Sequence, residues 1–199
     1  MTIEGDDNAL ESGSPVLEVA QERHIPGVVD IVEKLKMNPY KPEPEKLARG
    51  FLIYTLDARG YMRRLNELFI VQTQGDRVDG FLMCYDRAFL QTLINDGEEK
   101  HEQGILNFIQ SIEPEDNFVY GGQIGVDPET RQRGMGRGMI ERVLASMRNR
   151  HINHMYAAIL HAPVRNDVSI AFSGATGAQN VGDGLNDDGL LWGIYRWSA

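Results

Sequence analysis

The sequence of 199 residues contains a single cysteine, so it cannot form an internal disulfide. Cys84 lies in an apolar run, which predicts a buried and unreactive thiol. With one cysteine, cytoplasmic residence is the default expectation. The sequence also lacks an apolar run long enough to cross a membrane. Residues 1–14 are acidic and have no apolar segment of the signal-peptide type, so we expect a disordered arm there and no membrane partner.

Positive charge is scarce, with 20 Lys and Arg residues against 29 Asp and Glu residues and a net charge of −9. This balance argues against a general nucleic-acid binder, which would be basic. A negative potential would suit a cationic partner, although acidity for solubility alone is the interpretation we favour. Metal ligands are also missing, because His151 and His154 flank a predicted turn without a nearby carboxylate. The hydrophobic content of 42% predicts one globular domain over residues 15–199.

The most informative segment is residues 123–140. An apolar stretch that ends at Val126 predicts a strand, and Asp127 with Pro128 predicts a turn. A basic loop punctuated by glycines follows, and then a helix with an apolar face. Backbone N–H groups at a helix N-terminus bind phosphate, and Gly134 and Gly136 would let a ligand approach them closely. The segment therefore predicts a phosphate site.

The spacing of this loop distinguishes between phosphate-binding motifs. It lacks the Gly-Lys-Ser/Thr end of a Walker A loop, and Met139 stands where a dinucleotide fingerprint needs a third glycine. Residues 131–136 read Arg-Gln-Arg-Gly-Met-Gly and fit the pattern Arg/Gln-x-x-Gly-x-Gly/Ala. This resembles the pyrophosphate-binding motif of the GNAT superfamily of acyl-CoA-dependent N-acetyltransferases.

The order of predicted elements also resembles that family along nearly the whole chain after residue 15. We expect strands at 17–20, 68–74, 78–85, 118–126, 154–160 and 190–197, with helices at 25–36, 56–66, 136–150 and 164–173. Residues 40–45 and 183–189 are interpreted as loops, and polar residues 87–117 as an insertion with a helix-like patch. The resemblance implies an α/β (α+β) fold, with a mixed, mostly antiparallel sheet and helices on both faces. Its two central parallel strands would splay apart.

The resemblance implies a function as well as a fold. A GNAT enzyme transfers an acetyl group from acetyl-CoA to a primary amine of a small molecule or protein, by direct attack in a ternary complex and without a metal. A non-catalytic CoA-binding or regulatory module with the same fold is the alternative. Family members are often homodimers, so a homodimer is a further possibility.

The resemblance also assigns cofactor-binding residues. The pantetheine amides would pair with the strand end at Ile124, Gly125 and Val126, and Asn166 would help to hold the pantetheine. Asn166 is interpreted equally well as a helix cap. The pyrophosphate would lie on the loop residues Arg131, Gln132, Arg133, Gly134, Met135, Gly136 and Arg137.

The predicted catalytic positions depart from the family pattern. Tyr120 stands where many members have a glutamate base, and Ser173 stands where many have a tyrosine acid. Tyr120 is also interpreted as a core aromatic residue, and a bound water could replace Ser173. The acceptor would bind between residues 37–61 and the acidic segment 86–116, whose charge would either favour cationic amines or form a solvated face.

Overall fold

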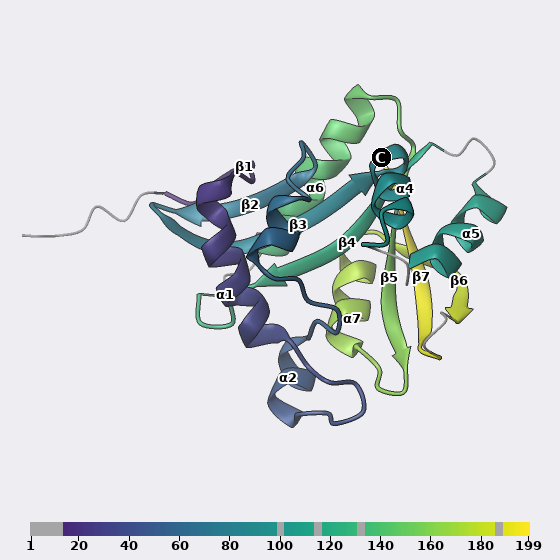
Figure 1. Ribbon diagram of the computed structural model, residues 1–199, viewed down its shortest axis with the longest axis horizontal. Coiled ribbons are helices and arrows are strands. Elements are labelled where there is room, and N and C mark those ends of the chain that lie inside the picture. Colours follow the sequence, from purple (N-terminus) through teal and green to yellow (C-terminus); the bar gives the residue numbers. More distant parts are fainter. Residues whose placement is uncertain (1–13, 99–101, 114–116, 131–133, 186–188) are drawn as a thin grey trace, which may run out of the picture.

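The computed structural model describes residues 14–98, 102–113, 117–130, 134–185 and 189–199. They form one seven-stranded sheet with helices on both sides (Figure 1). The strands are β1 (Val16–Val19), β2 (Phe69–Gln74), β3 (Arg77–Asp86), β4 (Phe118–Val126), β5 (His154–Ala162), β6 (Gln179–Leu185) and β7 (Leu191–Ser198). The helices are α1 (Ile25–Leu35), α2 (Pro44–Arg49), α3 (Ala58–Met62), α4 (Arg87–Asn95), α5 (Gln103–Ile112), α6 (Met135–Asn149) and α7 (Asp167–Ala175), and a short 3-10 helix, η1, spans Glu22–His24.

The strand order is β1-β2-β3-β4-β5-β7-β6, and every neighbouring pair is antiparallel except β4 and β5. These two parallel strands lie at the centre of the sheet, and the connection between them contains α6. Four residue pairs join them, from Phe118 opposite His154 to Gly121 opposite Ala157. The predicted fold class is confirmed, because the sheet is mixed and mostly antiparallel with one central parallel pair.

Each face of the sheet packs against its own set of helices. In β2 and β3, Val71 and Phe81 belong to one hydrophobic cluster, whereas Ile70 and Leu82 belong to the other. This alternation follows from the two-residue period of a strand. The first cluster includes buried residues of α1, α3, α4 and α5, and the second includes the apolar face of α6. Figure 1 shows α1 and α6 on opposite sides of the β2–β3 hairpin.

The β2–β3 hairpin turns at Gly75 and Asp76, as predicted. Gly75 has a φ of 62°, which a glycine adopts without steric cost. Cys84 lies fully buried in β3, as predicted, and this burial raises the pKa of its thiol. Among the described residues, no helix is long and apolar enough to cross a bilayer.

The structure corrects the interpretation of residues 87–117 as a polar stretch with one helix-like patch. It contains α4 and α5, both amphipathic, and Asp86 caps α4 by accepting a hydrogen bond from the Phe89 N–H at 2.9 Å. The apolar positions of each helix fall three or four residues apart and face the core. Their buried residues are Leu90, Leu93 and Ile94 in α4, and Ile105, Leu106 and Ile109 in α5.

Three further predictions were wrong in detail. The expected helix over 56–66 is limited to α3, because Asp57 caps it and the chain turns after Met62. The expected loop 40–45 ends at Pro44, which begins α2. Residues 183–185, interpreted as a turn, belong to β6, which pairs with β7 along its whole length. This strand reads Gln-Asn-Val-Gly-Asp-Gly-Leu and has few strand-forming residues, so tertiary pairing overrides its local propensity.

Candidate active site

A slot opens where β4 and β5 cease to pair. Their pairing ends at Gly121, whereas β4 continues to Val126. The Asp127 N–H donates to the Asp79 carbonyl at 2.9 Å, which fixes the alternation of hydrogen bonds between β3 and β4. By that alternation, the N–H and C=O groups of Ile124 and Val126 point away from β3 and toward the slot. The slot therefore presents strand-like backbone groups to whatever occupies it.

One end of the slot is a cavity of about 700 Å³. Its walls include the predicted residues Ile124, Gly125 and Val126 of β4, together with Gly134, Met135, Gly136 and Arg137. The first helical hydrogen bond of α6 runs from the Gly138 N–H to the Gly134 carbonyl at 2.9 Å. The N–H groups of residues 135–137 therefore precede the helical ladder, and the helix dipole adds partial positive charge there. Predicted residues Arg131, Gln132 and Arg133 lie outside the described residues.

The two loop glycines have different local surroundings. Gly134 has a φ of 92° and open space around its Cα, so its backbone conformation requires glycine. A Cβ at Gly136 would lie 2.8 Å from Cε2 of Phe172, so this glycine allows α6 to pack against α7. Both glycines line the larger cavity, but only at Gly134 is the space around the Cα open.

An ion-pair network holds the turn between β4 and the loop. The buried Asp127 carboxylate accepts a hydrogen bond from Lys34 of α1 at 2.9 Å and another from the Glu129 N–H at 2.9 Å. The hydrogen bond with Asp127 is the largest cause that raises the pKa of Lys34, so the ammonium stays charged. This network fixes the direction in which the chain leaves β4 toward α6.

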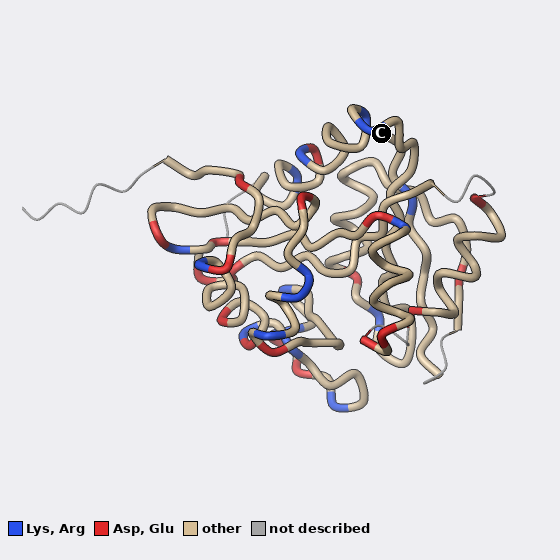
Figure 2. The backbone as a smooth tube through the Cα atoms, turned by 45° about the horizontal axis from the view of Figure 1, so that its top comes forward, with Lys and Arg blue, Asp and Glu red and all other residues tan. Residues whose placement is uncertain are grey.

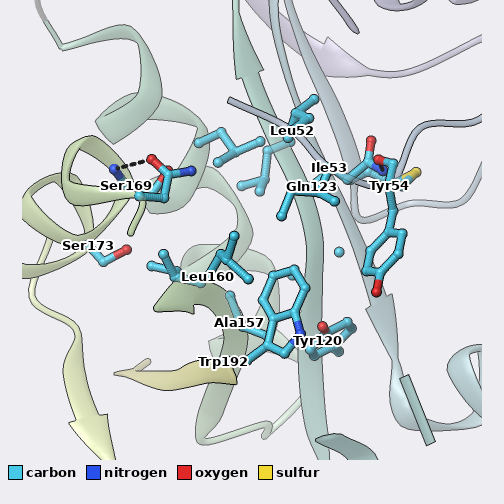
Figure 3. A pocket seen from close by; sticks show the side chains of 18 of the residues that line it. Leu52, Ile53, Tyr54, Tyr120, Gln123, Ala157, Leu160, Ser169, Ser173 and Trp192 are labelled. Atoms are coloured by element: carbon cyan, nitrogen blue, oxygen red, sulfur yellow. Dashed lines mark hydrogen bonds between the residues drawn. The ribbon is translucent and has the colours of Figure 1, made fainter. Parts of the chain in front are cut away.

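The other end of the slot is a smaller cavity of about 140 Å³, which Figure 3 shows. The two cavities are neighbours, because five residues line both: Phe51, Leu52, Ile124, Ser169 and Phe172. The smaller cavity has an aromatic wall in which Tyr54 and Trp192 stack with ring centroids 5.8 Å apart. In Figure 3, Ser169 and Ser173 lie on the opposite side of this cavity from Tyr54.

Residues 51–54 cross the slot and are held from three sides. The Met37 N–H donates to the Leu52 carbonyl at 2.8 Å, beyond the end of α1. Asn166 Nδ2 donates to the Phe51 carbonyl at 3.1 Å, and Gln123 Nε2 of β4 donates to the Tyr54 carbonyl at 2.8 Å. The segment therefore forms a fixed wall common to both cavities.

Asn166 performs the capping role that the sequence left open. Its Oδ1 accepts a hydrogen bond from the Ser169 N–H at 3.3 Å, the dashed line in Figure 3, and its Nδ2 binds Phe51. It is 6% exposed and lines the smaller cavity. The side chain thus joins the start of α7 to residues 51–54, and a direct contact with pantetheine stays a prediction.

Both predicted catalytic residues line the smaller cavity. Tyr120 is 2% exposed, and its hydroxyl donates to Glu102 Oε2 at 2.6 Å. Glu102 immediately precedes α5 and is 9% exposed. Ser173 is buried on α7 with its hydroxyl toward the cavity in Figure 3. Tyr120 is therefore a core aromatic residue whose polar end reaches a carboxylate at the cavity wall.

A family model described as acetyltransferase (GNAT) matches residues 33–174, more than two thirds of the sequence. The chain belongs to the acetyltransferase (GNAT) family. Members of this family are acyltransferases that use acetyl-CoA, and its fold is the one described above. A search of curated protein sequences gave no significant match.

Solved GNAT structures share the fold at low sequence identity. The ribosomal-protein-S18-alanine N-acetyltransferase of Escherichia coli aligns with a TM-score of 0.58 and 12% identity over 93% of this chain and 94% of its own. A polyamine N-acetyltransferase of Drosophila melanogaster, which forms N-acetylagmatine, gives 0.59 and 12% over 94% and 100%. The PaiA N-acetyltransferase of Thermoplasma acidophilum, solved in complex with coenzyme A, gives 0.59 and 9% over 94% and 99%.

In this GNAT domain, at least three residues that line the smaller cavity were not identified as site residues from the sequence. Glu102 was one acid among several in the acidic segment 86–116, and Gln123 and Trp192 each belonged to an expected strand. No local signal distinguishes them, because their roles depend on contacts far along the chain. Gln123 Oε1, for example, accepts a hydrogen bond from the Tyr61 hydroxyl of α3 at 2.7 Å.

Charge is distributed unevenly between the two cavities. Arg49 of α2 and Arg137 of α6 line the larger cavity, and Arg137 also donates to the Ala175 carbonyl at the end of α7. The described residues that line the smaller cavity include no cation and one carboxylate, Glu102. Figure 2 shows Lys and Arg interspersed with Asp and Glu along the chain rather than gathered by sign. The slot thus runs from a cationic mouth to an aromatic end that contains a carboxylate.

Proposed function

We propose that this GNAT protein transfers an acetyl group from acetyl-CoA to a primary amine by direct attack in a ternary complex. The observation that carries this proposal is that two neighbouring cavities share five lining residues. A ligand in the larger cavity and another in the smaller one would meet beside Ile124. Direct transfer needs this arrangement, because no covalent acyl-enzyme links the two substrates.

We further propose how acetyl-CoA lies in the slot. Its pyrophosphate binds the N–H groups of residues 135–137, with Arg49 and Arg137 adding positive charge. The pantetheine arm runs along β4 and pairs with the exposed backbone groups of Ile124 and Val126. A slot-facing N–H at the strand end then polarises the thioester oxygen and stabilises the tetrahedral intermediate.

The size of the smaller cavity limits the acceptor. At about 140 Å³ it is much smaller than the larger cavity of about 700 Å³, so we propose that it encloses the amine and the atoms next to it. The aromatic pair of Tyr54 and Trp192 favours an apolar group next to the amine. Glu102 favours a cationic head, in line with the expected preference for cationic acceptors.

Two experiments test this function. The first is calorimetric titration of the protein with acetyl-CoA, for which we expect saturable binding at about micromolar strength. The second measures free CoA thiol released in the presence of agmatine, spermidine, 2-phenylethylamine or a short peptide with an N-terminal alanine. These amines represent the acceptors of the structural neighbours and an apolar arylalkyl group.

Each outcome separates one function from another. Amine-dependent release of CoA supports acetyl transfer. Binding of acetyl-CoA without release for any amine would favour the CoA-binding module instead. No binding at millimolar ligand would exclude both functions and leave a GNAT fold with another purpose.

A further inference from the structure

A primary amine arrives at neutral pH as an ammonium ion, which has no lone pair with which to attack a thioester. The proposed function therefore requires a group in the smaller cavity that accepts a proton. Among the described residues that line this cavity, the titratable side chains are Tyr54, Tyr85, Glu102 and Tyr120. Glu102 is the one of these four that is ordinarily a base at neutral pH.

The geometry connects Glu102 to the centre of the sheet through Tyr120. The Tyr120 hydroxyl donates to Glu102 Oε2 at 2.6 Å, a distance typical of a hydrogen bond to a carboxylate. Tyr120 pairs with Tyr85 of β3 and Tyr156 of β5, one residue before the parallel pairing ends. Its backbone is therefore held on both sides, and a phenol hydroxyl can accept a hydrogen bond as well as donate one.

We propose that Glu102 is the final proton acceptor of the reaction and that Tyr120 relays the proton to it. This role rests on the proposed acetyl transfer and assigns the base that the sequence did not reveal. The carboxylate comes from the start of α5 rather than from β4 itself. The cavity therefore binds its acceptor in the ammonium form and converts it to the free amine in place.

Every proton in this relay is accounted for without a further reactant. The ammonium N–H gives its proton to Tyr120 Oη as the Tyr120 proton moves to Glu102 Oε2, which leaves a neutral amine, a neutral phenol and a carboxylic acid. The amine nitrogen then forms a bond to the thioester carbon, and the carbon–sulfur bond breaks. A second proton from the same nitrogen neutralises the CoA thiolate, and Glu102 returns its proton to solvent after the products leave.

The structure contains a matched pair that lies outside the cavity. The Tyr156 hydroxyl donates to Glu113 Oε2 at 2.9 Å, and neither residue lines the smaller cavity. Glu113 follows the last residue of α5, whereas Glu102 precedes the first, so one helix places a carboxylate beside each central strand. Both hydrogen bonds connect a strand tyrosine to a glutamate. Variants of the second pair therefore report the structural cost of removing such a bond.

The test measures kcat between pH 6 and pH 10 at saturating acetyl-CoA, with the amine of the panel that the wild-type protein acetylates fastest. Glu102→Gln should lower kcat at pH 7 by about 100-fold, the usual contribution of a general base. Its kcat should then rise about tenfold per pH unit toward the pKa of the amine, because only free base reacts. Tyr120→Phe should give the same profile, and the double variant should be no slower than either single variant.

Chemical rescue adds a measurement that a structural role would not affect. In Glu102→Ala, formate should fill the space of the carboxylate and raise kcat at least about tenfold. The acetyl-CoA Kd, measured by calorimetry, should stay within about threefold of wild type in every variant. Glu113→Gln and Tyr156→Phe should retain the wild-type pH profile.

The outcomes distinguish the relay from the function on which it rests. A wild-type protein that acetylates an amine while Glu102→Gln and Tyr120→Phe keep kcat within about threefold, with an unchanged pH profile, would overturn the relay alone. A wild-type protein that acetylates none of the four amines would overturn acetyl transfer and the relay together. If Glu102→Gln does not fold, Tyr120→Phe decides alone, because it removes one hydroxyl and keeps the aromatic packing.

Discussion

The two ends of the slot differ in what builds them. At the larger cavity, the proposed phosphate site is formed by backbone groups and glycines of residues 124–126 and 134–137, and residues of α1, α2 and α7 also contribute to the lining. The smaller cavity is shaped by side chains from segments far apart in the chain, among them Tyr54, Glu102, Tyr120 and Trp192. A backbone site tolerates many sequences but requires a particular spacing of glycines. A side-chain site needs no fixed spacing, so related proteins can vary it freely to accept different amines.

Gly134→Glu should have the largest effect, and we expect it to weaken cofactor binding in the larger cavity without altering the smaller cavity. The carboxylate would enter the open space where phosphate is proposed to bind, and we expect acetyl-CoA affinity to fall at least about 100-fold by calorimetry. Gly177→Glu is the matched control, because Gly177 has a similar φ of 94°, open space around its Cα and no place in either cavity. Equal losses in both variants, or affinity retained by Gly134→Glu, would contradict the role of the loop.

Asn166→Ala should have the next largest effect, because Asn166 joins the start of α7 to residues 51–54. The variant loses the cap of α7 and leaves the Phe51 carbonyl without its amide donor, at a cost of about 2 kcal/mol in the free energy of unfolding. Asn166→Ser keeps a capping oxygen and should recover about half of that loss in urea unfolding. If serine restored nothing, the contact with Phe51 rather than the cap would dominate.

The same difference explains how much of the slot could be predicted from the sequence. The loop and α6 were predicted closely because a strand, a turn, glycines and an apolar helix face follow one another in sequence. Glu102 was not predicted as a site residue, because nothing near it in sequence shows that α5 brings it to Tyr120, 18 residues away. The edge strand β6 was missed for a related reason, since its stability comes from pairing with β7 rather than from its own residues.

Changing each of the two tryptophans of the smaller cavity to phenylalanine should lower the free energy of unfolding by different amounts. Trp197 Nε1 donates to Thr176 Oγ1 at 3.1 Å, whereas Trp192 Nε1 is buried and has no hydrogen-bond partner among the described residues. Both residues line the smaller cavity, and both substitutions remove a similar volume. Trp197→Phe should therefore lower the free energy of unfolding by about 1 kcal/mol more than Trp192→Phe does. Equal losses in chemical denaturation would mean that the bond to Thr176 contributes nothing.

Tyr156→Phe, which changes a residue outside the smaller cavity, should have the smallest effect. Its effect on the free energy of unfolding should appear only in alkaline solution. Burial, together with the hydrogen bond to Glu113, raises the pKa of Tyr156 to about 12, so the fold favours the neutral phenol over the unfolded chain, whose tyrosines have a pKa near 10. This stabilisation is complete below pH 10 and disappears as the pH rises toward 12. The free energy of unfolding of Tyr156→Phe should therefore decrease less steeply than that of wild type between pH 10 and pH 12. Parallel curves would show that Tyr156 is ionised as easily in the folded protein as in the unfolded chain.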